Sequence, residues 1–392
     1  MKIIKILVVQ QTQAVWHKAG CSPAESPVGL SSVRTRANIC VPPPCAKPLP
    51  VSCNRTNQAY NMKLKLINLI FVTLFPNLIF GQFYPKYEEY KHFSVLKKND
   101  TINYHIYSTK NTKEAEGIIL FIQGSGAEPL FKIKKINDYV TIQSQVPFNL
   151  DKIPENFAFV VVSKKCLPFS TENDNFGVPN CFYENESLDY RVWQYNEVIK
   201  QILKKHIKNP KKVIVIGHSE GTDVVAKLGT VNKKITHIGF WSGGGITQYY
   251  DFALFIRKEV SEGKIDEQSA KQKTDSLLTK IKEIETESNS ISKKWLGNTY
   301  KRWNHFSEPS INNLLKINIP IFVAFGAKDV SVPLESALLI PIEFIRHKKD
   351  NLTFKIYPDY DHSFNKVPTN ENEDWKSNWM DVFDEFIEWT NK

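Results

Sequence analysis

The feature that most constrains this chain is the pentapeptide Gly217-His218-Ser219-Glu220-Gly221, which follows the apolar run at residues 213–216. An apolar run before this pattern and a helical pattern after it are typical of a strand that turns sharply into a helix. Glycines two residues before and two residues after the serine relieve crowding in such a turn and leave the hydroxyl exposed above a sheet. The pentapeptide alone is a weak signal, so the rest of the chain decides its meaning.

The segments around the pentapeptide alternate between apolar runs and helical patterns. Residues 118–122 and 157–162 are apolar throughout, as expected of strands buried on both faces of a parallel sheet. Residues 93–96 and 102–107, separated by a polar turn, indicate an antiparallel start. Further strands are predicted at 213–216, 235–241, 321–325 and 352–357, and helices at 187–206, 334–345 and 375–389. The alternation predicts one α/β domain over residues 82–392, with a mostly parallel sheet covered on both faces.

The alternation stops between residues 246 and 313, where the chain is highly charged and helical in pattern. We expect this segment to form an inserted helical cap. Its end is aromatic and includes Trp295 and Trp303. These rings have two interpretations, packing of the cap onto the core and a wall of the substrate-binding pocket.

Three polar residues follow predicted strands in the order Ser219, Asp329, His362. The carboxyl ends of parallel strands meet in one crevice, so residues far apart in sequence converge there. A serine hydroxyl becomes a nucleophile when a base removes its proton, and an imidazole base needs a carboxylate to hold its tautomer and stabilise its charged form. We therefore predict a nucleophile, an acid and a base at these positions, for a reaction that requires no bound cofactor.

Acyl transfer also needs two hydrogen-bond donors for the oxyanion that forms when a carbonyl is attacked. The backbone N–H of Glu220, directly after the serine, is one candidate donor. The backbone N–H of Ser125 is the other, because it lies in the glycine turn that follows the strand at 118–122. Gly124 in the same turn lets the backbone approach a substrate closely.

Together these residues resemble the α/β-hydrolase family, within it the esterases and dienelactone hydrolases. The resemblance covers about residues 117–392 and is carried by four motifs. They are Gln123-Gly124-Ser125-Gly126, the pentapeptide, Gly326-x-x-Asp329-x-x-x-Pro333 and Asp361-His362-Ser363-Phe364. It implies the α/β-hydrolase fold, no metal, and hydrolysis through an acyl-enzyme. Gln123 departs from the histidine that many esterases of the family carry before the first glycine.

Alternatives remain for several of these residues. Asp359 or Asp361 could supply the acid in place of Asp329, and His362 competes with eight other histidines. His305, in the aromatic end of the cap, is expected to be a surface or packing residue. The side chain of Glu220 could cap the helix or pair locally while its backbone N–H serves the oxyanion.

The N-terminal 81 residues differ from the remainder. Residues 62–81 have the charged start and apolar run of a secretory signal, too short for a comfortable transmembrane helix. Residues 1–61 show no sustained helix or strand period, so we expect the true start at Met62 and a secreted or periplasmic protein without a stable membrane span. The alternative is a genuine N-terminal extension with an uncleaved anchor.

Charge argues against a nucleic-acid partner. The net charge is +10, but residues 1–81 hold nine Lys and Arg and one acidic residue. The other 42 basic and 40 acidic residues nearly balance. We expect a small-molecule substrate of ester type, and the sequence leaves the oligomeric state open.

Two cysteines, Cys166 and Cys181, lie in the expected mature chain on either side of a polar loop. In an exported protein this arrangement favours a disulfide, with two free thiols as the alternative. A zinc site is not expected, because the thiols lack nearby histidines.

The function predicted first is a serine hydrolase that cleaves a carboxylic ester or thioester through an acyl-Ser219 intermediate. A peptidase of the same fold and a catalytically silent binding protein are the alternatives.

Overall fold

The computed structural model describes residues 5–9, 85–136, 139–173 and 175–392. The predicted signal at 62–81 and nearly all of the N-terminal extension lie outside these residues. Within the extension, β1 (Lys5–Val9) forms a strand that pairs in parallel with β6 (Tyr139–Ser144). We expected no regular strand there, because the short run Lys-Ile-Leu-Val-Val is too brief to show a period.

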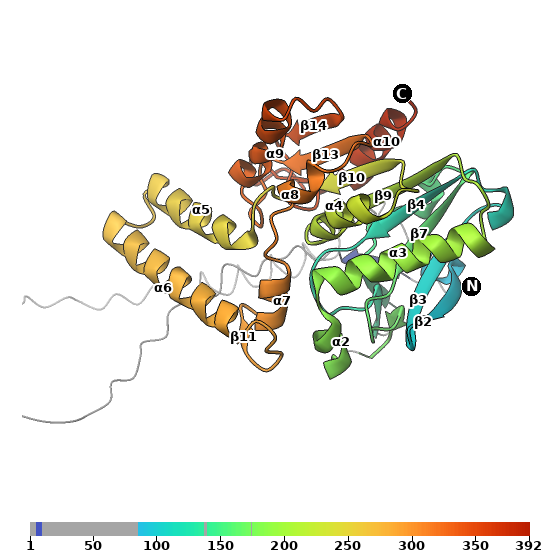
Figure 1. Cartoon of the computed structure of the whole chain (residues 1–392), viewed down its shortest axis with the longest axis horizontal. Coiled ribbons are helices and arrows are strands. Elements are labelled where there is room, and N and C mark those ends of the chain that lie inside the picture. Colours follow the sequence, from blue (N-terminus) through green and yellow to red (C-terminus); the bar gives the residue numbers. More distant parts are fainter. Residues whose placement is uncertain (1–4, 10–84, 137–138, 174) are drawn as a thin grey trace, which may run out of the picture. The chain divides into compact units, whose positions relative to one another are not determined.

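An eight-stranded sheet organises the structure (Figure 1). Its strand order is β14-β13-β10-β9-β4-β7-β3-β2. The first six of these are parallel neighbours, whereas β3 pairs antiparallel with both β7 and β2, as the antiparallel start predicts. The strands span Lys91–Lys97 (β2), Asp100–Tyr107 (β3), Gly117–Ile122 (β4), Phe157–Val162 (β7), Lys212–His218 (β9), His237–Trp241 (β10), Ile321–Gly326 (β13) and Leu352–Tyr357 (β14).

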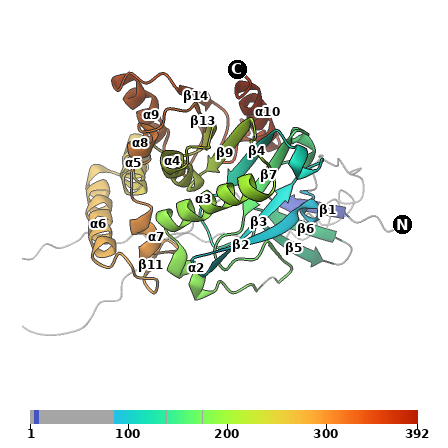
Figure 2. The ribbon, with the colours of Figure 1, turned by 45° about the vertical axis from the view of Figure 1, so that its right-hand side comes forward.

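Both faces of the sheet are buried, as the continuous apolar strands predict. All six residues of β4, β7 and β13 are buried. On one face α3 (Leu188–Lys205), α4 (Gly221–Val231) and α9 (Leu334–Arg346) pack against alternate strand residues such as Ile118 and Val215. In Figure 2, α3 and α4 lie in front of the strands.

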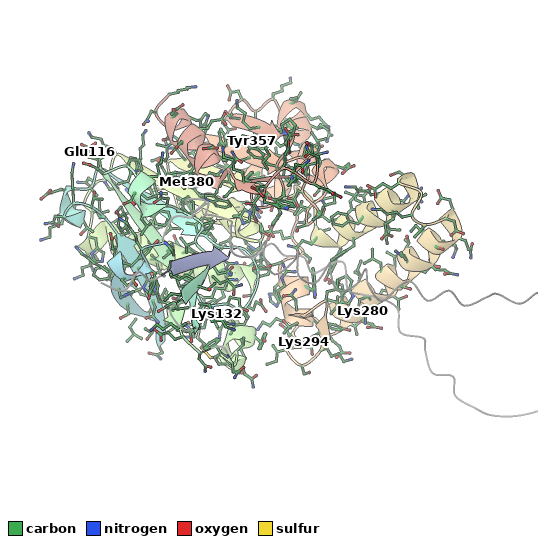
Figure 3. The ribbon with its side chains drawn as sticks, turned by 180° about the vertical axis from the view of Figure 1, so that it is seen from behind. Glu116, Lys132, Lys280, Lys294, Tyr357 and Met380 are labelled. Atoms are coloured by element: carbon green, nitrogen blue, oxygen red, sulfur yellow. A yellow bond between two sulfur atoms is a disulfide. The ribbon has the colours of Figure 1, made fainter. Side chains whose placement is uncertain are left out.

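The other face is covered differently. There α10 (Trp379–Trp389) packs with a smaller sheet against Phe121 and Ile216. The smaller sheet has the order β1-β6-β5-β8, with β5 at Phe131–Ile136 and β8 at Ser170–Thr171. Figure 3 views this face, with Met380 marking α10 and Lys132 marking β5. The sequence did not reveal the β5–β6 hairpin, because Phe-Lys-Ile-Lys-Lys-Ile is charged and alternates only in part.

The segment between β10 and β13 is helical, as predicted. Helices α5 (Gln248–Ser261) and α6 (Glu267–Thr286) form a pair, and β11 (Lys294–Trp295) with β12 (Asn298–Thr299) makes a short ribbon. Helices α7 (Tyr300–His305) and α8 (Ile311–Leu314) lead back to the sheet. Figure 1 shows α5 and α6 standing apart from the strands. We call residues 246–313 the cap and residues 127–156, between the turn after β4 and β7, the β5–β6 insert.

Strand register brings the predicted motifs to one edge of the sheet. Ile122 at the end of β4 pairs with Gly217 in β9, so the turn that begins at Gln123 lies beside the pentapeptide. Trp241 at the end of β10 pairs with His218, and Gly326 at the end of β13 pairs with Tyr357. The segments carrying Ser219, Asp329 and His362 therefore leave the sheet at the same carboxyl edge.

Candidate active site

Ser219 lies in a sharp turn between β9 and α4. Its φ is 55°, in the left-handed region that residues other than glycine seldom adopt. The turn is held by a hydrogen bond from the Ser219 N–H to the Trp241 carbonyl at 3.0 Å and by one from the Thr222 N–H to the Ser219 carbonyl at 2.9 Å. This geometry projects the serine from the end of the strand, as a nucleophile elbow does.

The two glycines of the pentapeptide are required by close backbone contacts. A Cβ on Gly217 would lie 2.2 Å from the carbonyl oxygen of Gly221. A Cβ on Gly221 would lie 2.2 Å from the carbonyl oxygen of Ile122. Both distances are far shorter than a van der Waals contact, so α4 can approach β4 and β9 this closely only with glycine at both positions.

Asp329 and His362 are brought together from the ends of β13 and β14. His362 Nδ1 lies 2.7 Å from Asp329 Oδ2. The other oxygen, Asp329 Oδ1, accepts hydrogen bonds from the backbone N–H groups of Ser331 and Val332 at 2.7 and 3.0 Å. The carboxylate is thereby fixed in place with one oxygen left for the imidazole.

The two alternative acids do not contact the imidazole of His362 by any hydrogen bond within the described chain. Asp361 Oδ1 accepts from the backbone N–H groups of Ser363 and Asn365 at 2.9 and 2.8 Å, so this carboxylate caps its own turn. Asp359 is exposed on the same turn. The geometry therefore pairs His362 with Asp329.

His362 is buried, and its second ring nitrogen is available. Among the residues that the structure describes, Nε2 of His362 has no hydrogen-bond partner. Burial by itself lowers the pKa of His362. The charge of Asp329 and the hydrogen bond to it together raise the pKa by more than burial lowers it, so the net pKa lies above the ordinary value of 6.5. A buried imidazole that is fixed by a carboxylate at one nitrogen, has no partner at the other among the described residues and lines a pocket is suited to proton transfer.

A pocket joins these groups. Ser219 and His362 both line it, together with Gly124 and Ser125 of the turn after β4. Its remaining walls come from β4, the β5–β6 insert and the C-terminal segments, at Phe121, Ser144, Gln145, Pro147, His218, Ser363 and Trp379. Of the described residues that line it, none carries a charged side chain other than histidine, and none belongs to the cap.

The predicted oxyanion donors lie beside the serine. A Cβ on Gly124 would be 3.0 Å from Ser219 Cβ, so the turn passes close to the nucleophile. Glu220 is the N-cap of α4, and backbone N–H groups at a helix start have no partner within the helix. Gln123 points elsewhere, because its Nε2 donates to the Val162 carbonyl and its Oε1 accepts from the Tyr195 hydroxyl. The Gln123 side chain, which departs from the family pattern, therefore links the turn to β7 and α3.

Comparisons with known proteins agree with this architecture. Residues 290–392 match the model of the dienelactone hydrolase family. That match includes Asp329 and His362 but not Ser219. The strand order, the elbow after β9 and this match decide the fold. The chain is an α/β-hydrolase in fold.

Solved structures of low sequence identity are similar to this chain. An acylaminoacyl peptidase from Pyrococcus horikoshii has 12% identity and a TM-score of 0.48, over 83% of this chain and 43% of that one. Est1E from Butyrivibrio proteoclasticus has 14% identity and a TM-score of 0.42, over 76% and 97%. A cold-adapted esterase from an Arctic intertidal metagenomic library has 12% identity and a TM-score of 0.41, over 71% and 87%. Comparison with curated proteins gives no match.

His218 is a pocket residue that the sequence did not single out. Its Nε2 lies 2.8 Å from the carbonyl oxygen of His362, so Nε2 donates this hydrogen bond. Burial, and then the neighbouring His362, lower the pKa of His218 to about 3, which keeps the ring neutral near pH 7. His218 therefore holds the backbone of the candidate base. Its place directly before Ser219 was the available signal.

A buried ion cluster beneath the elbow was also missed. Glu220 Oε1 accepts from Arg191 Nη1 at 2.8 Å, and Glu220 Oε2 accepts from Arg302 Nε at 2.7 Å. Burial raises the pKa of Glu220, but the neighbouring cations, Arg302 first, bring it below its ordinary value. Arg191 comes from α3 and Arg302 from α7 of the cap, so no local pattern pairs them. The Glu220 side chain pairs with these distant residues and makes no capping hydrogen bond to α4.

The two tryptophans at the end of the cap pack against each other and against Phe252. The Trp295 and Trp303 rings lie 5.0 Å apart, each also contacts Phe252, and Trp303 Nε1 donates to the Trp295 carbonyl at 2.8 Å. Neither ring lines the pocket described above. The two rings pack on each other within the cap, and their interpretation as walls of a substrate pocket stays a prediction. His305 contacts Asn289 at the surface, at 3.2 Å.

Cys166 and Cys181 form a disulfide, with Cα atoms 6.1 Å apart. The bond ties the loop after β7 to α2 (Asn180–Asn185). Among the described residues, no helix is both long and apolar enough to cross a membrane.

Proposed function

We propose that the chain is a serine hydrolase that cleaves a carboxylic ester or thioester through an acyl-Ser219 intermediate. The observation that carries this proposal is the 2.7 Å contact between Asp329 and His362, with His362 Nε2 unpartnered in the described chain and Ser219 lining the same pocket. The fold and the match to the dienelactone hydrolase family support an enzyme of the hydrolase class.

In the first half-reaction His362 Nε2 removes the proton of Ser219 Oγ as the oxygen attacks the substrate carbonyl carbon. The backbone N–H groups of Ser125 and Glu220 stabilise the resulting oxyanion. When the tetrahedral intermediate collapses, the bond to the alcohol or thiol breaks and His362 returns the proton to that leaving group. Asp329 stays ionised and stabilises the imidazolium while it exists.

The second half-reaction repeats these steps with water. His362 Nε2 removes a proton from water, the hydroxide adds to the acyl carbon, and the same donors stabilise the second oxyanion. Collapse releases the carboxylic acid, and His362 returns the proton to Ser219 Oγ. The cycle therefore ends with every group in its starting state.

The pocket lining favours an uncharged ester or thioester over a peptide end. Phe121, Pro147 and Trp379 offer apolar contact, while Ser144 and Gln145 offer polar groups. An exopeptidase must bind a terminal ammonium or carboxylate, and a charged side chain usually does so. Among the described lining residues, none of Asp, Glu, Lys or Arg is present to bind such a group.

We further propose that the protein is secreted or periplasmic. The apolar segment expected as a signal at 62–81 supports this location, and so does the Cys166–Cys181 disulfide, since disulfides persist mainly in oxidising compartments. N-terminal sequencing of the native protein tests it: a mature start near Gln82 agrees, and a start at Met1 contradicts it.

Two assays separate this function from its alternatives. A fluorophosphonate probe should label the wild-type protein and leave Ser219→Ala unlabelled, whereas a catalytically silent binding protein would fold well and remain unlabelled. A panel of p-nitrophenyl esters and aminoacyl-anilides then distinguishes substrates. We expect ester turnover, and cleavage of anilides alone would establish a peptidase instead.

A further inference from the structure

Three carbonyl groups of the turn after β4 are bound by buried cations. Arg191 Nη2 donates to the Gln123 carbonyl at 2.7 Å. Lys164 Nζ donates to the carbonyls of both Gly124 and Gly126, each at 2.7 Å. A single ammonium group therefore bridges the turn that carries Ser125.

The direction of these carbonyls determines the direction of the neighbouring N–H groups. In a planar trans peptide, the C=O of one residue and the N–H of the next point in opposite directions. The described chain has no cis peptide bond. Because Lys164 binds the Gly124 carbonyl, the Ser125 N–H points away from Lys164. Gly124 and Ser125 line the pocket beside Ser219.

Lys164 is itself held in place. It lies two residues beyond Val162, the last residue of β7, and is only 7% exposed. The carbonyl of the preceding residue, Ser163, accepts from Gln194 Nε2 at 3.0 Å, which anchors the backbone at this point. A lysine is seldom buried without partners, and the two carbonyls supply them here.

The ammonium group lies among other charges. Burial and then Arg191 lower the pKa of Lys164 to about 7, while Glu220 and Glu186 act in the opposite direction. Arg191 and Glu220 belong to the cluster beneath the elbow, where Glu220 joins Arg191 to Arg302. The cluster therefore includes Glu220, the residue that follows the nucleophile, and contacts the turn through Arg191.

We propose that Lys164 is a positioning residue that orients the Ser125 N–H toward the oxyanion, and this inference rests on the proposed function. Glycine on both sides of Ser125 makes rotation of the Gly124–Ser125 peptide inexpensive. Without Lys164 the two carbonyls lose their donor, and the peptide is free to turn its N–H away from the pocket.

The test compares Lys164→Met with Lys165→Met. Lys165 is the adjacent lysine, and it pairs with Asp100 instead of the turn. Loss of an oxyanion donor costs about 10²- to 10³-fold in kcat, so we expect kcat of Lys164→Met on a p-nitrophenyl ester to fall about 10- to 100-fold. KM should change by less than about threefold, because the ground-state ester makes little use of the oxyanion donors. Lys165→Met should retain wild-type kcat.

A second readout separates positioning from general loss of structure. A trifluoromethyl ketone forms a tetrahedral adduct with the serine that carries the oxyanion, whereas the corresponding secondary alcohol does not. For Lys164→Met the affinity for the ketone should fall in parallel with kcat, while the affinity for the alcohol stays unchanged. Unchanged kcat and ketone affinity in a folded Lys164→Met protein would overturn the proposal, and so would equal weakening of ketone and alcohol.

If Lys164→Met does not fold, Lys164→Arg decides the question. Its planar guanidinium cannot reproduce the ammonium geometry, so kcat and ketone affinity should fall together by a smaller factor. No change in either would contradict the proposal. Fluorophosphonate labelling of the wild type separates failure of the proposed function from failure of this inference. An unlabelled wild type rejects the proposed function. A labelled wild type, with kcat and ketone affinity unchanged in the Lys164 variant, rejects only this inference.

Discussion

The cap and the β5–β6 insert are the two long segments added between strands of the eight-stranded sheet, and they meet the candidate site differently. The cap is the longer and more helical, and its α5–α6 pair stands apart from the strands (Figure 1). The insert is short and partly charged, yet it supplies Ser144, Gln145 and Pro147 to the pocket. In the rear view of Figure 3, Lys280 and Lys294 mark the cap and Lys132 marks the insert.

The difference teaches that the size of an insertion does not identify the pocket wall. The cap contacts the site through Arg302, which binds the Glu220 side chain. Its tryptophans pack within the cap. The insert lies on the sheet face that carries Phe121 and that α10 also covers, and both Phe121 and Trp379 of α10 line the pocket. Substrate selection is therefore expected to follow the insert, and stability of the elbow to follow the cap.

The largest expected effect is on kcat, and it concerns Asp329 and His362, which belong to neither the cap nor the insert. Asp329→Asn should lower kcat about 10⁴-fold, because the amide no longer selects the correct tautomer of His362 or stabilises the imidazolium. Asp359→Asn is the matched control, since Asp359 is exposed on the turn before His362. Steady-state kinetics on a p-nitrophenyl ester measure both. Equal losses in the two variants would show that the acid has been assigned wrongly.

A smaller effect separates the two insertions directly. Gln145→Trp adds bulk to the pocket and should lower kcat/KM for long-chain p-nitrophenyl esters by about 10- to 100-fold, with less effect on the acetate. Trp295→Ala removes a ring from the cap cluster and should lower thermal stability while leaving the acyl-chain preference unchanged. If Trp295→Ala changed the acyl-chain-length preference and Gln145→Trp did not, the cap and not the insert would form the pocket wall.

The smallest effect is on the pH profile. Because Asp329 raises the pKa of His362 above 6.5, kcat/KM should be level above that pKa and fall roughly tenfold per pH unit below it, as His362 becomes protonated and cannot accept the Ser219 proton. His305→Gln in the cap should leave this limb in place. If the fall of kcat/KM at low pH disappeared in His305→Gln, the titrating group would be His305 of the cap and not His362.

The fold was largely predictable from sequence because its strands are continuous apolar runs and its reactive residues follow strand ends. Ser219, Asp329 and His362 each come directly after a strand or one turn later, so strand order alone placed them at one edge. The β5–β6 hairpin was not predictable, since its lysines mask the apolar face that packs under Phe121.

The supporting residues of the site could not be found from sequence for a different reason. Lys164, Arg191 and Arg302 lie on three separate segments and meet only through the folded backbone near Glu220. A buried charge has no periodic signature, and its partners here include main-chain carbonyls, which every residue has. Only the tertiary structure distinguishes such a residue from a solvated one.

Site-specific labelling of Ser219 tests the central claim most directly. After reaction with a fluorophosphonate, peptide mapping by mass spectrometry should locate the added mass on the peptide that contains Ser219. The mass should be absent in Ser219→Ala, and it should appear far more slowly in His362→Ala, because the base is lost. A well-folded wild-type protein that takes up no probe, or takes it up at another serine, would contradict the account.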